Sequence, residues 1–391
     1  MPLPKSKVAF VTGANGISGN AIIEHLIRQP RGEWSRIVVT SRNAPSNYWE
    51  DPRVEFIELD FLSPVEDLIS RMTPICNDVT HAYFTSYVHV DEFNKLKDSN
   101  VALFENFLTT IDTVAGTSLQ RVCLQTGVKH YGCHLGPTPA PMSEEHPRYD
   151  DKGLNFYYIQ EDLLFTLHKK RQWSWNVIRP SAIVGFTPAR SGMAQGLSVA
   201  LYFVICRELG EKPVFPGNKF SWTVAENQSS AAGLADMTIW ATTQPHTANE
   251  AFNHADGDIY CYRDLFPRIG AYFGVQVEEP KFAARGESFK YIENEFALKE
   301  WAEDKQPVWE LITKKYGGKP EAFGWGTWRV MDWALGKSWS AATSISKARK
   351  FGWTRYDDTW DNWVDTIRAF ENAGILPRLP VLGNRANYYD A

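Results

Sequence analysis

The sequence predicts an α/β fold: a doubly wound parallel sheet that carries a smaller, mostly helical lobe in its C-terminal half. Short β-branched and apolar runs alternate with segments of helical periodicity as far as Pro180. A glycine-rich turn joins the first of these strands to the first helix. Strands that alternate with helices are typical of a parallel sheet covered on both faces.

The expected strands follow in order from short apolar runs bounded by turn residues. They cover residues 7–12, 36–40, 54–59, 81–85, 121–125 and 175–178. Apolar residues at helical spacing predict helices that include residues 20–28, 100–114 and 157–170. Beyond Pro180 the alternation fades, and residues 251–254 are expected to return to the sheet as one more strand.

Composition narrows the class of protein. The 391 residues are 43% hydrophobic, which is enough for a substantial core. The net charge of -5 gives no indication of a nucleic-acid partner. Five scattered cysteines without a CxxC pair favour reduced thiols in a cytoplasmic protein. The longest apolar run, residues 198–206, is too short to span a membrane, so we expect a buried helix there and no membrane partner.

The first turn carries the most informative motif, TGANGISG at residues 12–19, with glycines at 13, 16 and 19. Glycine permits a tight turn and a close approach of backbone to a pyrophosphate. The helix that starts there offers free N–H groups and the positive end of its dipole. Because the motif follows a strand and opens a helix, it predicts a Rossmann-type dinucleotide site. An ordinary glycine-rich turn is the alternative.

The end of the second strand indicates which dinucleotide is bound. It reads Thr40-Ser41-Arg42-Asn43 and lacks the acid that NAD-preferring sites place there. Arg42 can pair with a 2′-phosphate and Ser41 can hydrogen-bond to it, so NADPH is the expected cofactor. A solvated surface arginine is the alternative for Arg42. Asp60, after the third strand, either accepts from the adenine amine or caps the next helix.

These patterns divide the chain into two parts. Residues 1–185, with the returning strand near 250–254, are expected to form an NADP-binding Rossmann domain, and residues 186–391 mainly a substrate-binding lobe. The residues expected to bind the cofactor are Gly13, Asn15, Gly16, Ile17, Gly19, Ser41, Arg42, Asp60, Phe61, Thr85, Thr126, Gly127, Lys129, Tyr158, Pro180 and Ile183. Nine of the fifteen tryptophans lie in residues 301–363, as the walls of an apolar pocket or as core anchors of a helical lobe.

The glycine spacing resembles the extended type of the short-chain dehydrogenase/reductase superfamily. That superfamily normally carries Tyr-x-x-x-Lys on one helix, with the tyrosine as proton donor. Here Tyr157 is followed four residues later by Glu161, and Tyr158 by Asp162, so the usual lysine is missing. Lys129 occurs instead just after the fifth strand, whose carboxyl end faces the ligand crevice in such folds.

Two runs, TGVKHY at residues 126–131 and NFYYIQED at 155–162, together resemble the progesterone 5β-reductase/iridoid synthase-like (PRISE) family, in a fungal-type member. The resemblance extends through RPSAIVGF at 179–186 and NEAFN at 249–253, and it weakens after about residue 290. In that family the lysine of the first run and the second tyrosine of the second run are the catalytic pair. The resemblance therefore implies catalytic roles for Lys129 and Tyr158.

The resemblance also implies the reaction, an NADPH-dependent reduction of an enone or enal in specialised metabolism. Hydride delivered to the β-carbon builds negative charge on the carbonyl oxygen, to which Tyr158 would hydrogen-bond. The Lys129 cation would stabilise that charge and lower the pKa of the tyrosine. Carbonyl reduction, reductive cyclisation and a non-catalytic NADP-binding sensor of the NmrA type are the alternatives. The presence of both Tyr158 and Lys129 argues against the sensor.

Several features set limits on this assignment. The run KHYGCHLGP at residues 129–137 is longer than the KHYxGP of plant members, and TSYVH at 85–89 lacks the family's tryptophan. Both flank the expected substrate cleft, so only a small apolar carbonyl compound is expected as the partner. His130 and His134 have no third ligand in the sequence pattern, so no metal is expected. The oligomeric state is open, a homodimer being one alternative.

Overall fold

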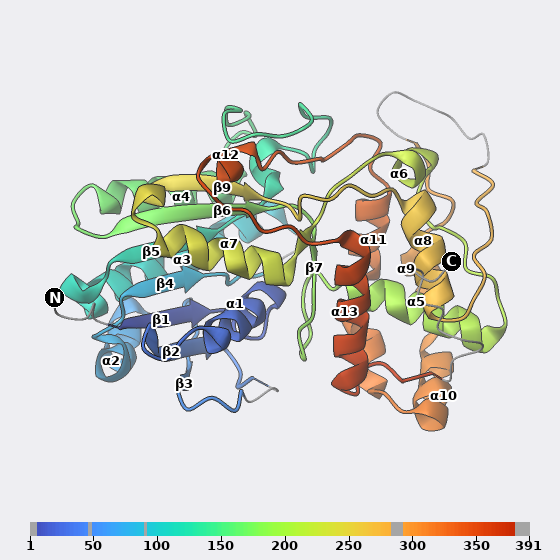
Figure 1. The fold of residues 1–391 in the computed structure, drawn as a ribbon, viewed down its shortest axis with the longest axis horizontal. Coiled ribbons are helices and arrows are strands. Elements are labelled where there is room, and N and C mark those ends of the chain that lie inside the picture. Colours follow the sequence, from blue (N-terminus) through green and yellow to red (C-terminus); the bar gives the residue numbers. More distant parts are fainter. Residues whose placement is uncertain (1–5, 46–48, 90–91, 283–291, 380–391) are drawn as a thin grey trace.

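The computed structural model describes residues 6–45, 49–89, 92–282 and 292–379. Its main feature is a seven-stranded parallel sheet in the order β3-β2-β1-β4-β5-β6-β9 (Figure 1). The strands are β1 (Lys7–Thr12), β2 (Trp34–Ser41), β3 (Val54–Glu58), β4 (His81–Phe84), β5 (Arg121–Gln125), β6 (Ser174–Pro180) and β9 (Glu250–His254). The predicted doubly wound sheet is confirmed, including the returning strand, which pairs in parallel with β6.

Helices connect these strands and form most of the C-terminal half. They are α1 (Ile17–Arg28), α2 (Val65–Cys76), α3 (Phe93–Ala115), α4 (Phe156–His168), α5 (Gln195–Leu209), α6 (Lys219–Thr223), α7 (Ala231–Thr243), α8 (Tyr262–Tyr272), α9 (Leu298–Ala302), α10 (Gln306–Tyr316), α11 (Trp328–Leu335), α12 (Ser346–Lys350) and α13 (Thr359–Asn372). Helix α3 starts at Phe93, before the predicted residue 100. Its first turns are largely exposed and show no apolar stripe, so the sequence pattern does not indicate them.

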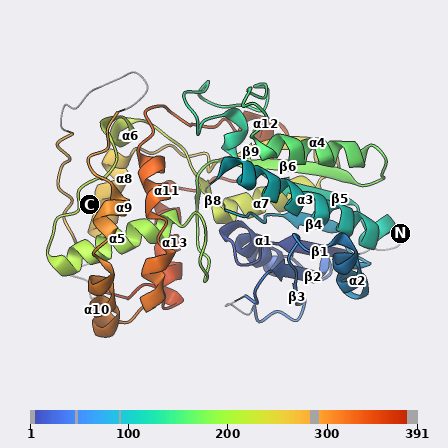
Figure 2. The same ribbon diagram turned by 180° about the vertical axis from the view of Figure 1, so that it is seen from behind.

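Both faces of the sheet are covered because its strands are apolar on both sides. Along β1, Val8 and Phe10 pack with α2, α3 and α4, whereas Ala9 and Val11 pack with α1 and α7. Figures 1 and 2 show these two helical layers from opposite sides. This two-sided burial explains why the strands appear in the sequence as continuous apolar runs rather than alternating ones.

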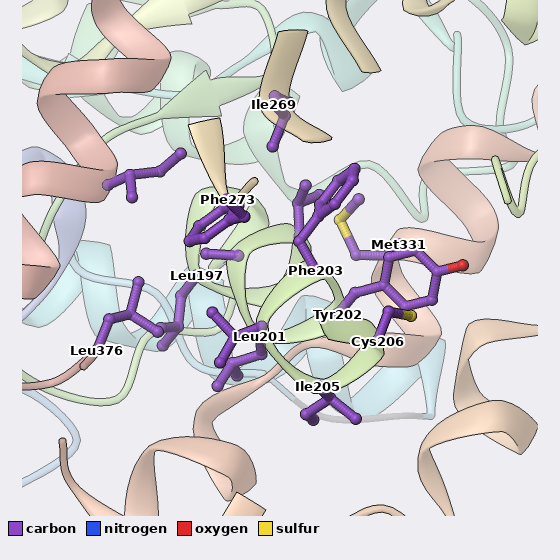
Figure 3. Close-up of a cluster of buried hydrophobic side chains, with 14 of the residues drawn as sticks. Leu197, Leu201, Tyr202, Phe203, Ile205, Cys206, Ile269, Phe273, Met331 and Leu376 are labelled. Carbon is purple, nitrogen blue, oxygen red and sulfur yellow. The ribbon is translucent and has the colours of Figure 1, made fainter. Parts of the chain in front are cut away.

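The C-terminal half is built around α5, whose residues 196–206 are all buried. Side chains of α5 such as Leu201 and Phe203 meet Phe273 and Met331 in one apolar cluster (Figure 3). Trp309 and Trp363 are fully buried in the same cluster, as core anchors of this half. No helix in the described part of the chain combines the length and apolar character needed to cross a membrane.

One segment late in the chain returns to the sheet half. Helix α12 packs beside β9, and the Lys347 ammonium pairs with Glu250 at 2.7 Å. The Trp353 indole nitrogen donates to Asp236 of α7 at 2.8 Å. A two-stranded sheet, β7 (Ile183–Val184) with β8 (Ser229–Ser230), adds a further link near the carboxyl end of the main sheet. The sheet half is therefore assembled from several separate parts of the chain.

Candidate active site

The glycine-rich turn has the geometry that a pyrophosphate requires. Gly13 adopts φ +68°, a left-handed conformation that favours glycine. A Cβ on Gly19 would lie 2.2 Å from the carbonyl oxygen of Gly13, so the turn and α1 can pack this closely only without a side chain. Helix α1 begins after Gly16 with no side-chain cap and no acid in its first turn. Its first N–H groups are thus available for an anion.

The next group of predicted residues gathers at the end of β2. The Asn15 side-chain nitrogen donates to Ser41 Oγ at 3.1 Å and to the carbonyl of Asn43 at 3.0 Å. The Asn15 side-chain oxygen is buried and has no hydrogen-bond partner among the residues that the structure describes. Arg42 is exposed, and its guanidinium makes no ion pair with any residue that the structure describes. Two of the predicted residues, Asn15 and Ser41, are therefore in direct contact, and Arg42 follows Ser41 at the end of β2.

The side chains of Asp60 and Phe61, after β3, have different surroundings. Asp60 Oδ1 accepts from the backbone N–H of Leu62 at 3.0 Å, which shapes the turn that leads into α2. The ring of Phe61 is buried in the core and packs edge-on against Phe10 and Phe107. Since that ring lies within the apolar layer, it is not available as a platform for an adenine, and only the backbone of Phe61 remains for the predicted contact.

The remaining predicted cofactor residues lie at the carboxyl ends of β4, β5 and β6. Thr85 donates its hydroxyl to the carbonyl of Thr12 at 2.6 Å and stands against Gly13. Thr126 is buried, and its hydroxyl oxygen has no hydrogen-bond partner in the described part of the chain. A Cβ on Gly127 would lie 3.6 Å from the carbonyl oxygen of Pro180, which ends β6. Ile183 follows in β7 and packs against the apolar layer of α1 and α7.

A dinucleotide fits this arrangement on structural grounds. Buried polar atoms without partners, Asn15 Oδ1 and Thr126 Oγ1, lie along the loops that follow β1 and β5. Such orphaned atoms are costly unless a ligand or water satisfies them. The uncapped start of α1 directly follows the loop after β1 and would hold the phosphates, with Ser41 and Arg42 at the end of β2.

Lys129 lies in the short 3-10 turn η2 (Val128–Tyr131) that follows β5. Burial lowers the pKa of its ammonium group. The ammonium makes no hydrogen bond or ion pair with the described parts of the chain. The side-chain nitrogen of Asn155 donates to the carbonyl of Lys129 at 3.1 Å and so ties the turn to the start of α4. Lys129 is thus a half-buried cation that is held in place by its backbone.

The two adjacent tyrosines of α4 differ in what their hydroxyls contact. Tyr158 donates to the carbonyl of His130 and accepts from the backbone N–H of Tyr149 at 3.2 Å. Its ring is covered by the guanidinium of Arg148, 4.7 Å from the ring centroid. Both hydrogen-bonding directions of the Tyr158 hydroxyl are therefore used by backbone groups. This tyrosine has the contacts of a structural residue.

Tyr157 has the opposite surroundings. Its hydroxyl makes no hydrogen bond within the described ranges, and a Cβ on Gly127 would lie 3.6 Å from its oxygen. Burial raises the pKa of this phenol, so it stays protonated at neutral pH. The unpartnered phenol beside the Lys129 turn is thus that of Tyr157, whereas the hydroxyl of Tyr158, the tyrosine predicted to be catalytic, is bonded to backbone groups.

Glu161 is a further residue of the site and was not among the predicted site residues. Its carboxylate is 1% exposed and lies 2.9 Å from Arg179 and 3.3 Å from His130. The spacing of Tyr157 and Glu161 at i and i+4 places them on one face of α4, and this was the available signal. The ring of His130 is therefore engaged with a carboxylate, and no group of three or more metal-ligating side chains occurs among the residues described.

Proteins of known sequence resemble this chain over most of its length. The chain is 41% identical over 380 residues to the short chain dehydrogenase gsfE of Penicillium aethiopicum, covering 95% of this chain and 100% of that protein. It is 30% identical over 381 residues to a 3-oxo-Delta(4,5)-steroid 5-beta-reductase of Arabidopsis thaliana, covering 93% of this chain and 92% of that one.

Solved structures show the same fold. The UDP-glucose 4-epimerase of Thermus thermophilus, in complex with NAD, matches with a TM-score of 0.63 and 14% identity, over 94% of this chain and 99% of that chain. At this level of identity the likeness concerns the fold alone. The family described as a PRISE-like Rossmann-fold domain matches residues 9–329. The chain therefore belongs to the PRISE-like family and is an oxidoreductase of the atypical short-chain dehydrogenase/reductase type.

Proposed function

We propose that this protein is an NADPH-dependent reductase of α,β-unsaturated carbonyl compounds, with Tyr157 and Lys129 as its catalytic pair. The observation that carries the proposal is the unpartnered Tyr157 hydroxyl beside Gly127, two residues before the unpaired ammonium of Lys129. Both groups lie where β5 ends, and ligands of open α/β sheets bind at the carboxyl ends of the strands. The proposal replaces Tyr158 with Tyr157 on the evidence of their hydrogen bonds.

The surroundings of the pair suit a reaction that builds negative charge on an oxygen. NADPH, when bound, would supply the hydride for the β-carbon of the substrate. The Tyr157 hydroxyl would hydrogen-bond to the carbonyl oxygen as charge develops there. Its raised pKa keeps the phenol protonated, and Lys129 adds a positive charge in a part-buried place. The enol oxygen would thus receive its proton from a group that is already in place.

The preference for NADPH rests on the end of β2. Arg42 is an exposed cation without a partner in the described structure. The adjacent Ser41 accepts a hydrogen bond from the Asn15 side chain. A 2′-phosphate would give Arg42 the anionic partner that it lacks. An acid that would repel this phosphate is absent from residues 40–43.

A conjugated carbonyl is favoured over an isolated one by the relatives. The name of the Arabidopsis thaliana relative describes a reductase of a 3-oxo-Delta(4,5)-steroid, whose 3-oxo group is conjugated with the 4,5 double bond. In this chain, the Tyr87 ring is tilted against the ring of Phe156, with centroids 6.0 Å apart, and Phe156 packs edge-on against Tyr157. Phe156 is buried, whereas Tyr87 is exposed and offers apolar surface close to the pair. A small apolar enone is therefore the substrate class that we propose.

The proposal is tested by determining which carbon of the substrate receives the hydride. The protein is mixed with NADPH deuterated at C4 of the nicotinamide and with either 2-cyclohexenone or a 3-oxo-Δ4 steroid, and the products are analysed by NMR. We expect deuterium on the β-carbon of a saturated ketone. Deuterium on the carbonyl carbon would replace the proposal with carbonyl reduction. Tight NADPH binding without reduction of either compound, or of a panel of enals and ketones, would favour a cofactor-binding sensor.

A further inference from the structure

Glu161 occupies the position, four residues after Tyr157, where the superfamily normally has its lysine. Its carboxylate is 1% exposed and is shared among three basic side chains. Oε1 lies 2.9 Å from Arg179 and 3.3 Å from His130, and Oε2 lies 3.0 Å from Arg148. A buried carboxylate with three such partners is a junction between elements rather than a surface charge.

These partners converge on the turn that carries Lys129. The His130 ring contacts Glu161, and the His130 carbonyl accepts from the Tyr158 hydroxyl. The Tyr131 hydroxyl donates to Asn253 of β9 at 2.6 Å, and the Arg179 guanidinium lies over the Tyr131 ring at 5.8 Å. The turn is thus fixed from α4, β6 and β9, and Glu161 links the first two of these elements.

The charges around Glu161 balance only while it stays ionised. Glu161 and Asp162 face Arg179 and Arg148, and burial lowers the pKa of His130, which keeps that ring neutral. Hydrogen bonding to His130 and the nearby Arg179 outweigh burial and hold the pKa of Glu161 at about 2. Without this carboxylate, Arg179 would be a buried cation with no acidic partner among the described residues, which is strongly unfavourable.

We infer that Glu161 is a positioning residue, which fixes the turn that carries Lys129 and so sets the place of the ammonium beside Tyr157. The inference rests on the proposed function. It also accounts for the missing Tyr-x-x-x-Lys pattern, because residue 161 faces the 129–131 turn together with Arg148 and Arg179. A lysine there would add a third positive charge to that group. A lysine at position 161, as in the superfamily, is therefore incompatible with the contacts that hold the Lys129 turn.

The first test needs no substrate. Hydrogen exchange of backbone amides is compared by mass spectrometry in Glu161→Gln and in Asp162→Asn, the neighbouring acid that pairs with Arg148 but is 61% exposed. We expect faster exchange in residues 127–132 of Glu161→Gln only, where His130 and Gly132 donate to backbone carbonyls of the turn. Unchanged exchange, or an increase spread through the whole sheet, would overturn the positioning role. Glu161→Asp, which keeps the charge, serves if the glutamine variant does not fold.

The second test links the turn to turnover of 2-cyclohexenone or a 3-oxo-Δ4 steroid. Displacement of a catalytic group costs on the order of 10²-fold in rate, so kcat of Glu161→Gln should fall by about that factor with NADPH affinity retained. In a Lys129→Ala background the same substitution should change kcat little, because its effect acts through Lys129. If the double variant loses kcat by the product of the two single-variant factors, the inference is refuted. If the unaltered protein reduces no carbonyl compound, the proposed function fails while the exchange result still decides the role of Glu161.

Discussion

The side-chain nitrogen of Asn155 lies 3.1 Å from the carbonyl oxygen of Lys129 and donates to it. The oxygen of the same side chain caps α4 by accepting from the backbone N–H of Tyr157. One asparagine therefore joins the turn of the lysine to the first turn of the helix that carries the tyrosine. Through these two hydrogen bonds Asn155 helps to set the separation of the two groups.

The two tyrosines make a matched pair of variants. Tyr157→Phe should cut kcat for enone reduction by on the order of 10²–10³-fold, since a hydrogen bond to the developing charge is lost. Its NADPH dissociation constant, measured by fluorescence, should stay nearly unchanged. Tyr158→Phe leaves the His130 carbonyl and the Tyr149 N–H unpaired, which should cost about 1–3 kcal/mol of stability with far less effect on turnover. A larger loss of turnover in Tyr158→Phe would restore Tyr158 as the catalytic residue.

The role of Arg42 can be read from cofactor preference. Arg42→Glu places a negative charge beside the expected 2′-phosphate, and kcat/KM with NADPH should fall by about tenfold to a hundredfold, as for loss of a charged hydrogen bond. With NADH, which lacks that phosphate, kcat/KM should change little. Arg42→Lys keeps the positive charge but lacks the planar guanidinium group. Its kcat/KM with NADPH should therefore lie between those of the unaltered protein and Arg42→Glu. Equal losses with both cofactors would show that Arg42 does not bind the phosphate.

The glycine turn predicts a steric effect. A Cβ at residue 19 would lie 2.2 Å from the Gly13 carbonyl oxygen, so Gly19→Ala must displace the turn or α1. We expect NADPH binding to be lost, together with a lower melting temperature. Gly32→Ala is the control, because a Cβ there meets nothing within 4 Å. Retention of NADPH affinity in Gly19→Ala would mean that the turn does not need this close packing.

We expect Asp256 to make the stability of the protein depend on pH. It is 0% exposed, and burial raises the pKa of its carboxyl group to about 7 from an ordinary value of 3.8. Between these two values the folded state binds a proton that the unfolded state has released, so this group makes stability fall as pH rises, with no further change above about 7. The full penalty is on the order of 4 kcal/mol.

Asp256→Asn should remove that penalty while keeping an acceptor for the Ser230 N–H. The free energy of unfolding of the variant, relative to that of the unaltered protein, should be larger at pH 8 than at pH 5. Denaturant titrations at the two pH values measure this difference. The neighbouring His254 has a pKa lowered by burial to about 3, which gives the opposite slope in both proteins and largely cancels in the comparison. A difference that is the same at both pH values would show that Asp256 ionises normally.

The sheet and the glycine turn could be predicted because their signals are local. Val8 to Val11 form one apolar run since both faces of β1 are buried, and the glycines of the turn mark where backbone must approach backbone. The choice between Tyr157 and Tyr158 had no local signal. Neighbours on a helix point about 100° apart, and which of them meets the backbone of Tyr149 and His130 depends on how those segments fold over α4.

The return of the late segment to the sheet half was also out of reach of the sequence. Trp353 belongs to the cluster of tryptophans that was assigned to the helical lobe, yet it packs against the α1 and α7 layer and donates to Asp236. Its aromatic character indicates burial but carries no information on which core receives it. Long-range placement of this kind is set by the three-dimensional packing of α12 beside β9.

The placement of Trp353 and α12 has a mechanical consequence. The polypeptide leaves the sheet half after β7, comes back for β8, α7 and β9, leaves again, and returns once more before α13. Several covalent connections therefore join the two halves, and they cannot all bend about a single hinge. Any closure of the helical half over a bound nucleotide would have to proceed by small sliding movements at several crossing points together.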